Sequence, residues 1–187
     1  MEKETALSVE DKAFLIKVVR KAISSKFAGG YSKKEARSSV ISEKLNAPCG
    51  VFVTLKKHGD LRGCIGNFRS QTPLIDNIYN MALAAAFEDN RFEPVTEDEL
   101  SDIQIEISVL SELFPVKPDE IEIGKHGLYL TFRHFGGVFL PQVPVEWGWD
   151  LQEYLDELCL KAHLPPGTHL HKEAVLEAFT ADVFHEE

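Results

Sequence analysis

The sequence has few cysteines and no long apolar run. Its three cysteines are Cys49, Cys64 and Cys159, and no two of them are spaced as C-x-x-C. An odd number without that spacing argues against a disulfide framework and favours a reducing cytoplasm. No stretch approaches the roughly 18 consecutive apolar residues that a membrane-spanning helix needs. The first residues lack a basic segment followed by an apolar core, so we expect no secretory signal.

Positive charge is also scarce. Lys and Arg number 20 against 30 Asp and Glu, which gives a formal net charge of −10 (20 − 30). This balance argues against a protein that works mainly by neutralising many phosphates, although it leaves a local basic patch open. The sequence lacks Walker A, GxGxxG, GxSxG and HExxH patterns. Their absence removes the commonest nucleotide-binding, hydrolase and zinc-protease classes, and we expect no cofactor.

What remains is an ordinary globular composition, with 44% hydrophobic and 27% charged residues in 187. The length favours one domain over residues 1–187, with room for a smaller sub-lobe. Helical spacing and capping residues predict helices, and alternation with turn residues predicts strands. The predicted helices cover about 8–27, 40–45, 72–88 and 150–163, with a capped turn at 96–99. The predicted strands cover 51–55, 61–66, 103–110, 128–133, 138–143 and 175–184. Hairpin signals dominate, which favours an α+β fold with a largely antiparallel sheet.

The most unusual stretch is Leu61–Gly66, which reads LRGCIG. On a regular strand Arg62 and Cys64 share one face, while Gly63 and Gly66 leave room for a ligand, another backbone or a bulge. A guanidinium beside a thiol favours the reactive thiolate. Cys64 is therefore a candidate nucleophile, with Arg62 holding an anion or a carboxylate. The alternative is a small buried cysteine in a tight hairpin, with Arg62 in a structural salt bridge.

Four further residues are candidates for the same site. Arg91 lies in a loop as part of Asp89-Asn90-Arg91, although an Asp and an Arg two residues apart are also typical of a self-paired turn. Glu106 lies on the polar face of the strand at 103–110, where it is a base if that face lines a cleft and a solvated carboxylate if it does not. His126 lies in a turn and Gln142 on a strand; both need the fold to bring them to Cys64.

A loose group of Cys and His residues lies near the C-terminus. It does not match a standard zinc spacing, so surface histidines are the favoured interpretation and we expect no metal site. The group consists of Cys159, His163, His169 and His171.

Several motifs in register resemble those of the AMMECR-one domain family, and together they span about residues 10–187. The family is named after a chromosomal region implicated in a human contiguous-deletion syndrome. The shared motifs, in order, are Leu61–Gly66, Asp89–Pro94, Ile107–Leu110, Gly124–Leu128 and Leu140–Val143 followed by Trp149-Asp150.

The resemblance implies a two-lobed α+β domain in which the motifs converge on a cleft between unequal lobes. It implies Memo-like and radical-SAM proteins as partners, because members are often encoded near these proteins or fused to the former. It gives no established activity. The likeness of the fold to modules that bind nucleotides, nucleic acids or peptides is an analogy of fold and does not give a function.

Three hypotheses follow. The first is an enzyme in which Cys64 is nucleophile or proton donor, His126 or Glu106 is the base, and Arg62, Arg91 and Gln142 bind an anionic substrate. The second is a nucleotide- or nucleic-acid-binding module with a basic patch near the predicted hairpin, against which the net charge weighs. The third is a peptide- or protein-binding partner without catalysis. We place the enzyme first, because a packed set of polar residues around a cysteine exceeds what binding alone requires. The patch residues are Lys56, Lys57, His58, Arg62 and Arg69.

Overall fold

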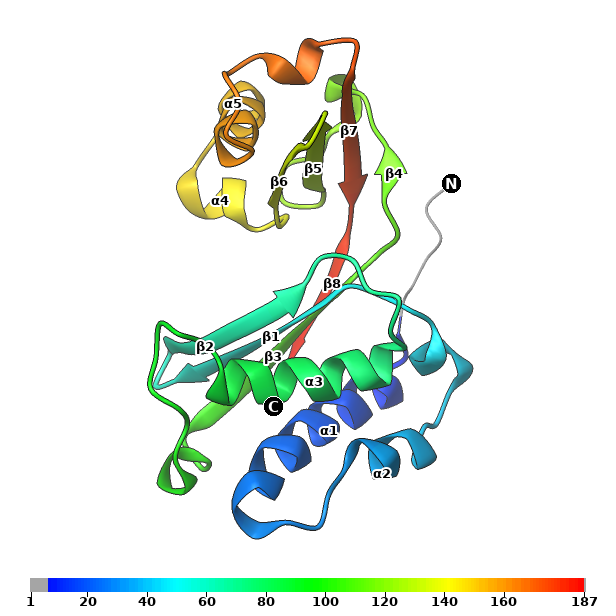
Figure 1. The fold of residues 1–187 in the computed structure, drawn as a ribbon, viewed down its shortest axis with the longest axis vertical. Helices are drawn as coiled ribbons and strands as arrows, with labels where there is room; N and C mark the ends of the chain where they lie inside the picture. The colour runs from blue at the N-terminus through cyan, green and yellow to red at the C-terminus, as the bar shows by residue number, and fades with distance from the viewer. Residues whose placement is uncertain (1–6, 187) are drawn as a thin grey trace. The chain divides into compact units, whose positions relative to one another are not determined.

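The computed structural model describes residues 7–186 and divides them into two compact units (Figure 1). The larger unit comprises residues 7–110 and 182–186, and the smaller unit comprises residues 111–181. Each unit contains a four-stranded antiparallel sheet and helices, which confirms the predicted α+β class. Within residues 7–186, no helix combines the length and apolar character needed to cross a membrane.

The larger unit is a sheet in the order β2-β1-β3-β8 with helices packed on one face (Figure 1). Its strands are β1 (Val51–Lys57), β2 (Asp60–Asn67), β3 (Ile103–Leu110) and β8 (Ala181–His185). Its helices are α1 (Val9–Ala28), α2 (Lys33–Ser38) and α3 (Leu74–Phe87), with 3₁₀ turns η1 (Glu43–Asn46) and η2 (Glu97–Glu99).

Alternation along the strands divides this sheet into two faces. Val53 and Ile107, with the other apolar strand residues, are buried in one cluster with Leu15, Val19 and Ile78 from α1 and α3. Burying these side chains against the helices supplies most of the stabilisation, about 25 cal/mol for each Å² removed from water. We call the opposite face, which carries Thr54, Cys64, Gln104 and Glu106, the polar face.

The smaller unit is a sheet in the order β4-β7-β5-β6, with α5 packed against β5 and β6. Its core includes Leu128, Leu130, Tyr154 and Leu158. Its strands are β4 (Phe114–Pro115), β5 (Gly127–Phe132), β6 (Phe135–Phe139) and β7 (Ala174–Phe179). Its helices are α4 (Val143–Trp147) and α5 (Leu151–Lys161), with 3₁₀ turns η3 (Pro118–Glu120) and η4 (Thr168–Leu170).

The chain passes between the units twice, once after β3 and once between β7 and β8. At this double passage, Ser111 N donates to Thr180 O at 2.9 Å, and Thr180 N donates to Ser111 Oγ at 2.9 Å. The prediction of one strand over 175–184 was therefore wrong. The segment is two strands, and each belongs to a different sheet.

Local capping explains most of the correct predictions. Ser8 caps α1 and Asp150 caps α5 through reciprocal bonds with Asp11 and Glu153. Three predictions were displaced. The helix expected at 40–45 is replaced by α2 and η1 on either side of Val40, and α3 begins at Leu74 with Pro73 as its N-cap. The strand expected at 138–143 ends at Phe139, because the LPQV run turns into α4.

Candidate functional site

A β-bulge determines which way Cys64 points. The register of β1 against β2 shifts between Leu55, which pairs with Gly63, and Lys56, which pairs with Leu61, so Arg62 is the extra residue. Without the bulge Cys64 would lie on the apolar side of the sheet, because a shift of one residue exchanges the two faces. With the bulge Cys64 pairs with Thr54 on the polar face.

Two charged side chains hold the backbone of Cys64. Cys64 N donates to Asp89 Oδ2 at 2.9 Å, and Arg91 Nη2 donates to Cys64 O at 3.1 Å. Asp89 and Arg91 also bond to each other, with Arg91 Nη2 at 2.7 Å from Asp89 Oδ2. Since β2 is an edge strand, this pair occupies hydrogen-bonding groups that an added strand would otherwise use. The self-paired turn expected from the sequence is present, and it also clamps the cysteine.

The electrostatics of the clamp follow from these bonds. Hydrogen bonds from Arg91 hold the pKa of Asp89 well below its usual range, against the opposing effect of burial. The Asp89 carboxylate in turn raises the pKa of Arg91, and the charge of Cys64 contributes to this increase. The Arg91 guanidinium lies beside Cys64, because its Nη2 also donates to the backbone carbonyl of that residue. Its side chain remains 58% exposed, so it is accessible to an anion.

The thiol has one hydrogen-bond partner on the polar face. Cys64 Sγ lies 3.1 Å from Thr54 Oγ1. Thr54 pairs on its other side with Glu106, so the three side chains form a row across β2, β1 and β3. The Glu106 carboxylate is held by Lys56 Nζ at 2.9 Å. Cys64 and Glu106 are two strand spacings apart, about 10 Å between backbones, which excludes a direct hydrogen bond.

Arg62 is engaged elsewhere. Its Nε donates to Glu99 Oε1 at 3.0 Å and its Nη2 donates to Glu99 Oε2 at 2.9 Å. Lys57 Nζ also lies 3.0 Å from Glu99 Oε1. These cations, Arg62 foremost, hold the pKa of Glu99 well below its usual range. The geometry is that of the structural salt bridge named above as the alternative for Arg62.

Gly63 and Gly66 allow other parts of the same chain to approach β2 closely. A Cβ on Gly63 would lie 2.1 Å from the carbonyl oxygen of Ala85 in α3, so the strand and the helix backbone touch here. A Cβ on Gly66 would lie 2.4 Å from the ring of Phe52. The sequence left a ligand, another backbone or a bulge open at these glycines. Gly63 lies against a second backbone, and the bulge lies next to it at Arg62.

His126 is buried in the smaller unit, only 4% exposed. Its Nδ1 accepts from Glu122 N at 3.1 Å, and its ring packs edge-on against Phe114. Because a backbone N–H can only donate, the neutral imidazole carries its proton on Nε2. Tyr154 Oη donates to His126 O at 3.2 Å, so the backbone here is held as well. These bonds give His126 a structural role in the loop before β5.

Gln142 also lies in the smaller unit, as the N-cap residue of α4 and not on a strand. In the Cys and His group, Cys159 Sγ lies 3.7 Å from His169 Nδ1, whereas the ring of His171 packs edge-on against Phe132. Burial lowers the pKa of His169. Across residues 7–186 no three His, Cys, Asp or Glu side chains are arranged to hold a metal ion.

The larger unit thus brings together Cys64, Arg91 and, through Thr54, Glu106. It contains Arg62 but ties it to Glu99, while His126 and Gln142 belong to the smaller unit. Sequence analysis missed the contributions of Asp89 to the backbone of Cys64 and of Thr54 to its thiol. The spacing of Asp89 and Arg91 signalled a pair but not its target, and Thr54 could be found only by knowing the bulge.

The basic patch expected at the hairpin is largely neutralised. Lys56 pairs with Glu106, and Lys57 and Arg62 share Glu99. Its remaining members are also engaged: His58 Nε2 lies 4.0 Å from Asp102, and the Arg69 guanidinium lies over the ring of Phe68. A phosphate would have to compete with carboxylates already in place at most of these positions.

Comparison with known proteins identifies the family. The sequence model of the AMMECR1 family matches residues 16–184. A protein of Methanothermobacter thermautotrophicus is 39% identical, covering 99% of each chain, and protein MJ0810 of Methanocaldococcus jannaschii is 39% identical, covering 96% of this chain and 92% of its own. The crystal structure of the uncharacterized protein PH0010 from Pyrococcus horikoshii matches with a TM-score of 0.78 at 35% identity, covering 93% of this chain and 90% of that one. The chain therefore belongs to the AMMECR1 family.

Proposed function

We propose that this protein is a cysteine-dependent enzyme acting on a small anionic substrate, with Cys64 as the reacting group. The supporting observation is the clamp on Cys64. Its N–H, its C=O and its Sγ each have a hydrogen-bond partner, contributed by Asp89, Arg91 and Thr54. Fixing one residue by two charged side chains costs side-chain entropy, and such fixing is typical of groups that must meet a substrate in one geometry.

In this proposal Arg91 supplies the positive charge. Its exposed guanidinium is bonded to the backbone of Cys64 and attracts a carboxylate or phosphate of the substrate towards the thiol. Thr54 orients the sulfur. The role of Glu106 as a base stays a prediction, because its carboxylate is paired with Lys56 and is too distant from Cys64 to accept the thiol proton directly. Arg62 acts as a positioning residue that ties the bulge beside Cys64 to Glu99.

The roles predicted for His126 and Gln142 stay predictions. The bond from Glu122 N to His126 Nδ1 occupies one imidazole nitrogen, which argues against a base that acts through that atom. Substrate contacts by Gly63 and Gly66 likewise stay predictions, since both positions are tightly packed. A reducing cytoplasmic location fits a working thiol and three free cysteines.

Alkylation of the native protein tests the proposal. Iodoacetamide labelling followed by peptide mass spectrometry reports each cysteine separately. We expect Cys64 to react in the folded protein, because its thiol lies on the polar face and is partly exposed. We expect Arg91→Gln to slow this reaction, because it removes the positive charge that is bonded to the backbone of Cys64. Cys159 is fully buried and serves as the internal control.

If Cys64, like Cys159, is labelled only after unfolding, the assignment of Cys64 as the nucleophile is excluded. An Arg91→Gln rate equal to the wild-type rate would exclude a contribution of Arg91 to the reactivity of the thiol. Arg69→Gln is the matched control. It removes another exposed arginine of the larger unit, and we expect it to leave the reaction rate of Cys64 unchanged.

A second candidate function is binding of a protein partner, and the exposed side chains of α4 favour it. Trp147 is 71% exposed and Val145 is 58% exposed, while Trp147 stacks on Trp149. Exposed tryptophan is typical of residues that dominate binding energy at protein interfaces. The smaller unit carries five basic and eleven acidic residues, a net charge of −6 (5 − 11), which favours a basic partner surface. The Memo-like and radical-SAM proteins implied by the family resemblance are the candidates.

Calorimetric titration with a purified Memo-like protein tests this function. We expect Trp147→Ala to weaken binding at least about tenfold, and Leu170→Ala, another exposed apolar position of the smaller unit, to change it little. Binding that is unaffected by Trp147→Ala would exclude α4 as the docking surface.

A further inference from the structure

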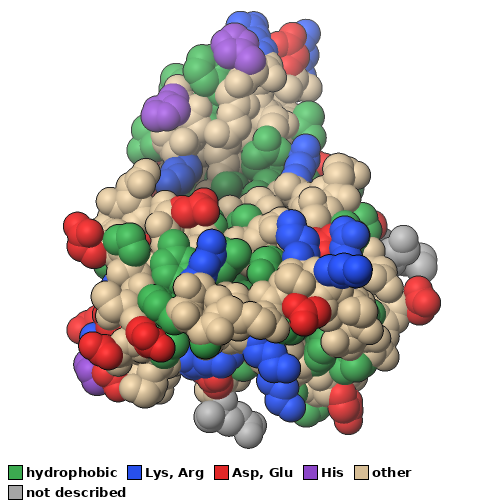
Figure 2. All heavy atoms as spheres, turned by 60° about the horizontal axis from the view of Figure 1, so that its bottom comes forward, with side chains coloured by type: hydrophobic (Ala, Val, Ile, Leu, Met, Phe, Trp, Pro, Cys, Tyr) green, Lys and Arg blue, Asp and Glu red, His purple; other side chains and the backbone are tan. Residues whose placement is uncertain are grey.

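The helical side of the larger unit carries a basic surface that the proposed site does not use. Residues 7–46 contain nine Lys or Arg and four Asp or Glu, a net charge of +5 (9 − 4), within a chain of net charge −10. Neighbouring Lys and Arg side chains are visible on the surface of this unit in Figure 2. We define the basic surface as Lys17, Lys21 and Lys26 of α1 together with Lys33 and Lys34 of α2.

These five lysines differ from three other cations of the same segment. Lys12, Arg20 and Arg37 are paired with Asp182, Glu186 and Asp76. The five lysines of the basic surface are exposed, and none lies within 4.0 Å of a carboxylate in the described part of the chain. Their charges are therefore available to an external anion.

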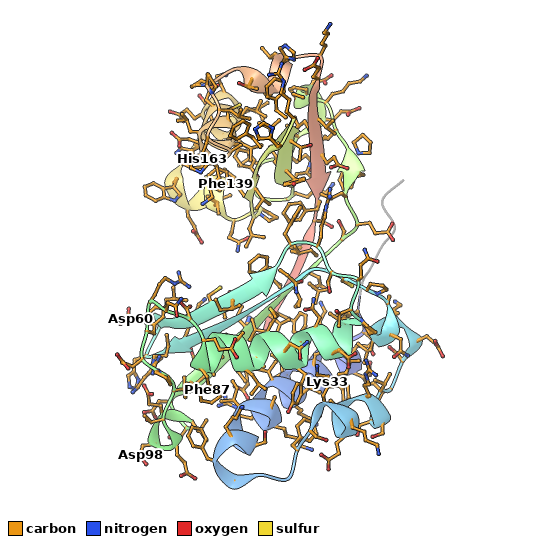
Figure 3. All side chains as sticks on the ribbon, in the orientation of Figure 1. Lys33, Asp60, Phe87, Asp98, Phe139 and His163 are labelled. Atoms are coloured by element: carbon orange, nitrogen blue, oxygen red, sulfur yellow. The ribbon has the colours of Figure 1, made fainter. Side chains whose placement is uncertain are left out.

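The lysines of the two helices belong to one surface. Lys17 and Lys21 are one turn apart on the solvent side of α1, about 6 Å along its axis. The Lys21 ammonium lies over the ring of Tyr31 at 5.4 Å, and Tyr31 is two residues before Lys33. Lys33, labelled in Figure 3, begins α2. A continuous anion can therefore contact both helices, whereas a single small anion cannot span them.

The surroundings of the lysines distinguish between polyanions. Insertion into a membrane needs exposed apolar side chains among the basic ones, but the apolar stripe of α1 is buried in the core. The strongly exposed apolar residues Val9 and Ile41 lie toward the start of α1, since Ser42 bonds to Asp11 there. Phe27, which follows Lys26, is 37% exposed, but its ring packs edge-on against Phe87. Single strands need aromatic rings to stack on, and Tyr31 is covered by Lys21 and Tyr79. A lysine ammonium binds a phosphate as a point charge and has no hydrogen-bond acceptor. These lysines therefore cannot accept a hydrogen bond from a 2′-hydroxyl of RNA or from a base.

We propose that the basic surface of α1 and α2 binds the phosphate backbone of double-stranded DNA without sequence preference. The contact is electrostatic and releases counterions, so it weakens steeply with salt. Four phosphate contacts give a slope of log K against log salt of about −3.6 and a loss of about 150-fold between 50 and 200 mM salt. This surface shares no residue with the Cys64 site, so either proposal can fail alone.

Fluorescence anisotropy with a labelled 20-base-pair DNA duplex tests the proposal on the full chain. The variant Lys17→Glu/Lys34→Glu reverses two charges of the basic surface. The control Lys161→Glu/Lys172→Glu makes the same change of net charge in the smaller unit. We expect the first variant to bind at least about tenfold more weakly at 50 mM salt, with a slope smaller in magnitude by about 1.8, and the control to lose less than about threefold. Circular dichroism checks that both variants are folded.

Each other outcome overturns the proposal. No binding of wild-type protein to the duplex at 50 mM salt removes the site. Equal losses in both variants assign the effect to net charge and not to this surface. Tighter binding to vesicles containing phosphatidylserine, or to an RNA duplex or single strand of the same sequence, would give the surface to another polyanion.

Discussion

The two units use their motif residues in opposite ways. In the larger unit, Asp89 and Arg91 hold the backbone of Cys64, and the thiol is left on the polar face beside Thr54. In the smaller unit, His126 is 4% exposed and its ring accepts a hydrogen bond from its own loop. The difference teaches that a cysteine or histidine is a site candidate only when its reactive atom is accessible and is not already used in a structural hydrogen bond.

We expect the largest effect from Gly63→Ala, which should destabilise the larger unit and not the smaller one. Gly63→Ala would place a methyl group 2.1 Å from the carbonyl oxygen of Ala85, so β2 or α3 must move. We expect a loss of about 3 kcal/mol in the free energy of unfolding. Both tryptophans lie in the smaller unit, so their fluorescence reports that unit while circular dichroism reports both. We expect the dichroism midpoint in urea to fall more than the fluorescence midpoint.

Gly59→Ala is the control for this comparison. It lies in the turn of the same hairpin, where a Cβ meets nothing within 4 Å, although its positive φ of 91° adds some strain. Equal shifts of both midpoints in Gly63→Ala would mean that the two units unfold together, and the contrast between them would not extend to stability.

Asp89→Asn should have the next largest effect. The change removes the charge that pairs with Arg91 and weakens the bond from Cys64 N, at a position where the carboxylate is 4% exposed. We expect about 2 kcal/mol of destabilisation. Urea unfolding measures it, and Asp182→Asn, which removes a more exposed ion pair with Lys12, should cost about 0.5 kcal/mol. Equal costs would show that the clamp has no special rigidity.

Acid should weaken the larger unit first. The pKa values of Asp89 and Glu99 are below their ordinary values of 3.8 and 4.5 in the folded protein. Above pH 5 both carboxylates are ionised in the folded and unfolded states, so their stabilisation is complete. As the pH falls below about 5 the unfolded chain binds protons first, and this stabilisation is lost progressively until the pH reaches the lowered pKa values of the folded protein. Dichroism melts from pH 6 to pH 2 measure this loss of stability, and the loss should be smaller in Asp89→Asn than in the wild type. Equal losses in the variant and the wild type would contradict the prediction.

Tyr154→Phe should have the smallest effect, and it sharpens the assignment of His126. The change removes the buried bond from Tyr154 Oη to His126 O, which should cost about 1 kcal/mol. Urea unfolding monitored by tryptophan fluorescence measures it. Reactivity of Cys64 toward iodoacetamide should not change. A slower reaction at Cys64 would contradict the division of roles and point to a link between the two motifs.

Local signals predicted the elements well. Ser8 with Asp11 and Asp150 with Glu153 predicted the starts of two helices, and alternation over 103–110 predicted β3 with its bounds. These signals depend on residues a few positions apart. The strand predicted over 175–184 failed because apolar residues continue through Thr180, while the break depends on which distant strands each half pairs with.

The site was harder to predict than the fold. Simple alternation does place Arg62 and Cys64 on one face, but a bulge at Arg62 alters both the partner of the thiol and the course of the guanidinium. The bulge has no sequence signal beyond a glycine on one side. The sequence predicts only a capped turn at 96–99, yet the carboxylate of Glu99 in that turn also binds Arg62 and Lys57. Such multiple use of one carboxylate depends on tertiary contacts.

The double passage of the chain has a consequence for biosynthesis. The larger unit needs β8, whose Phe184 enters its core and whose neighbour Glu186 binds Arg20, yet these residues are made after the whole of the smaller unit. During synthesis the sheet formed by the first 110 residues lacks β8 until the chain is nearly complete. Until then the edge of β3 that β8 covers is exposed. The segment translated in the middle can mature before the one translated first, so the order of folding differs from the order of synthesis.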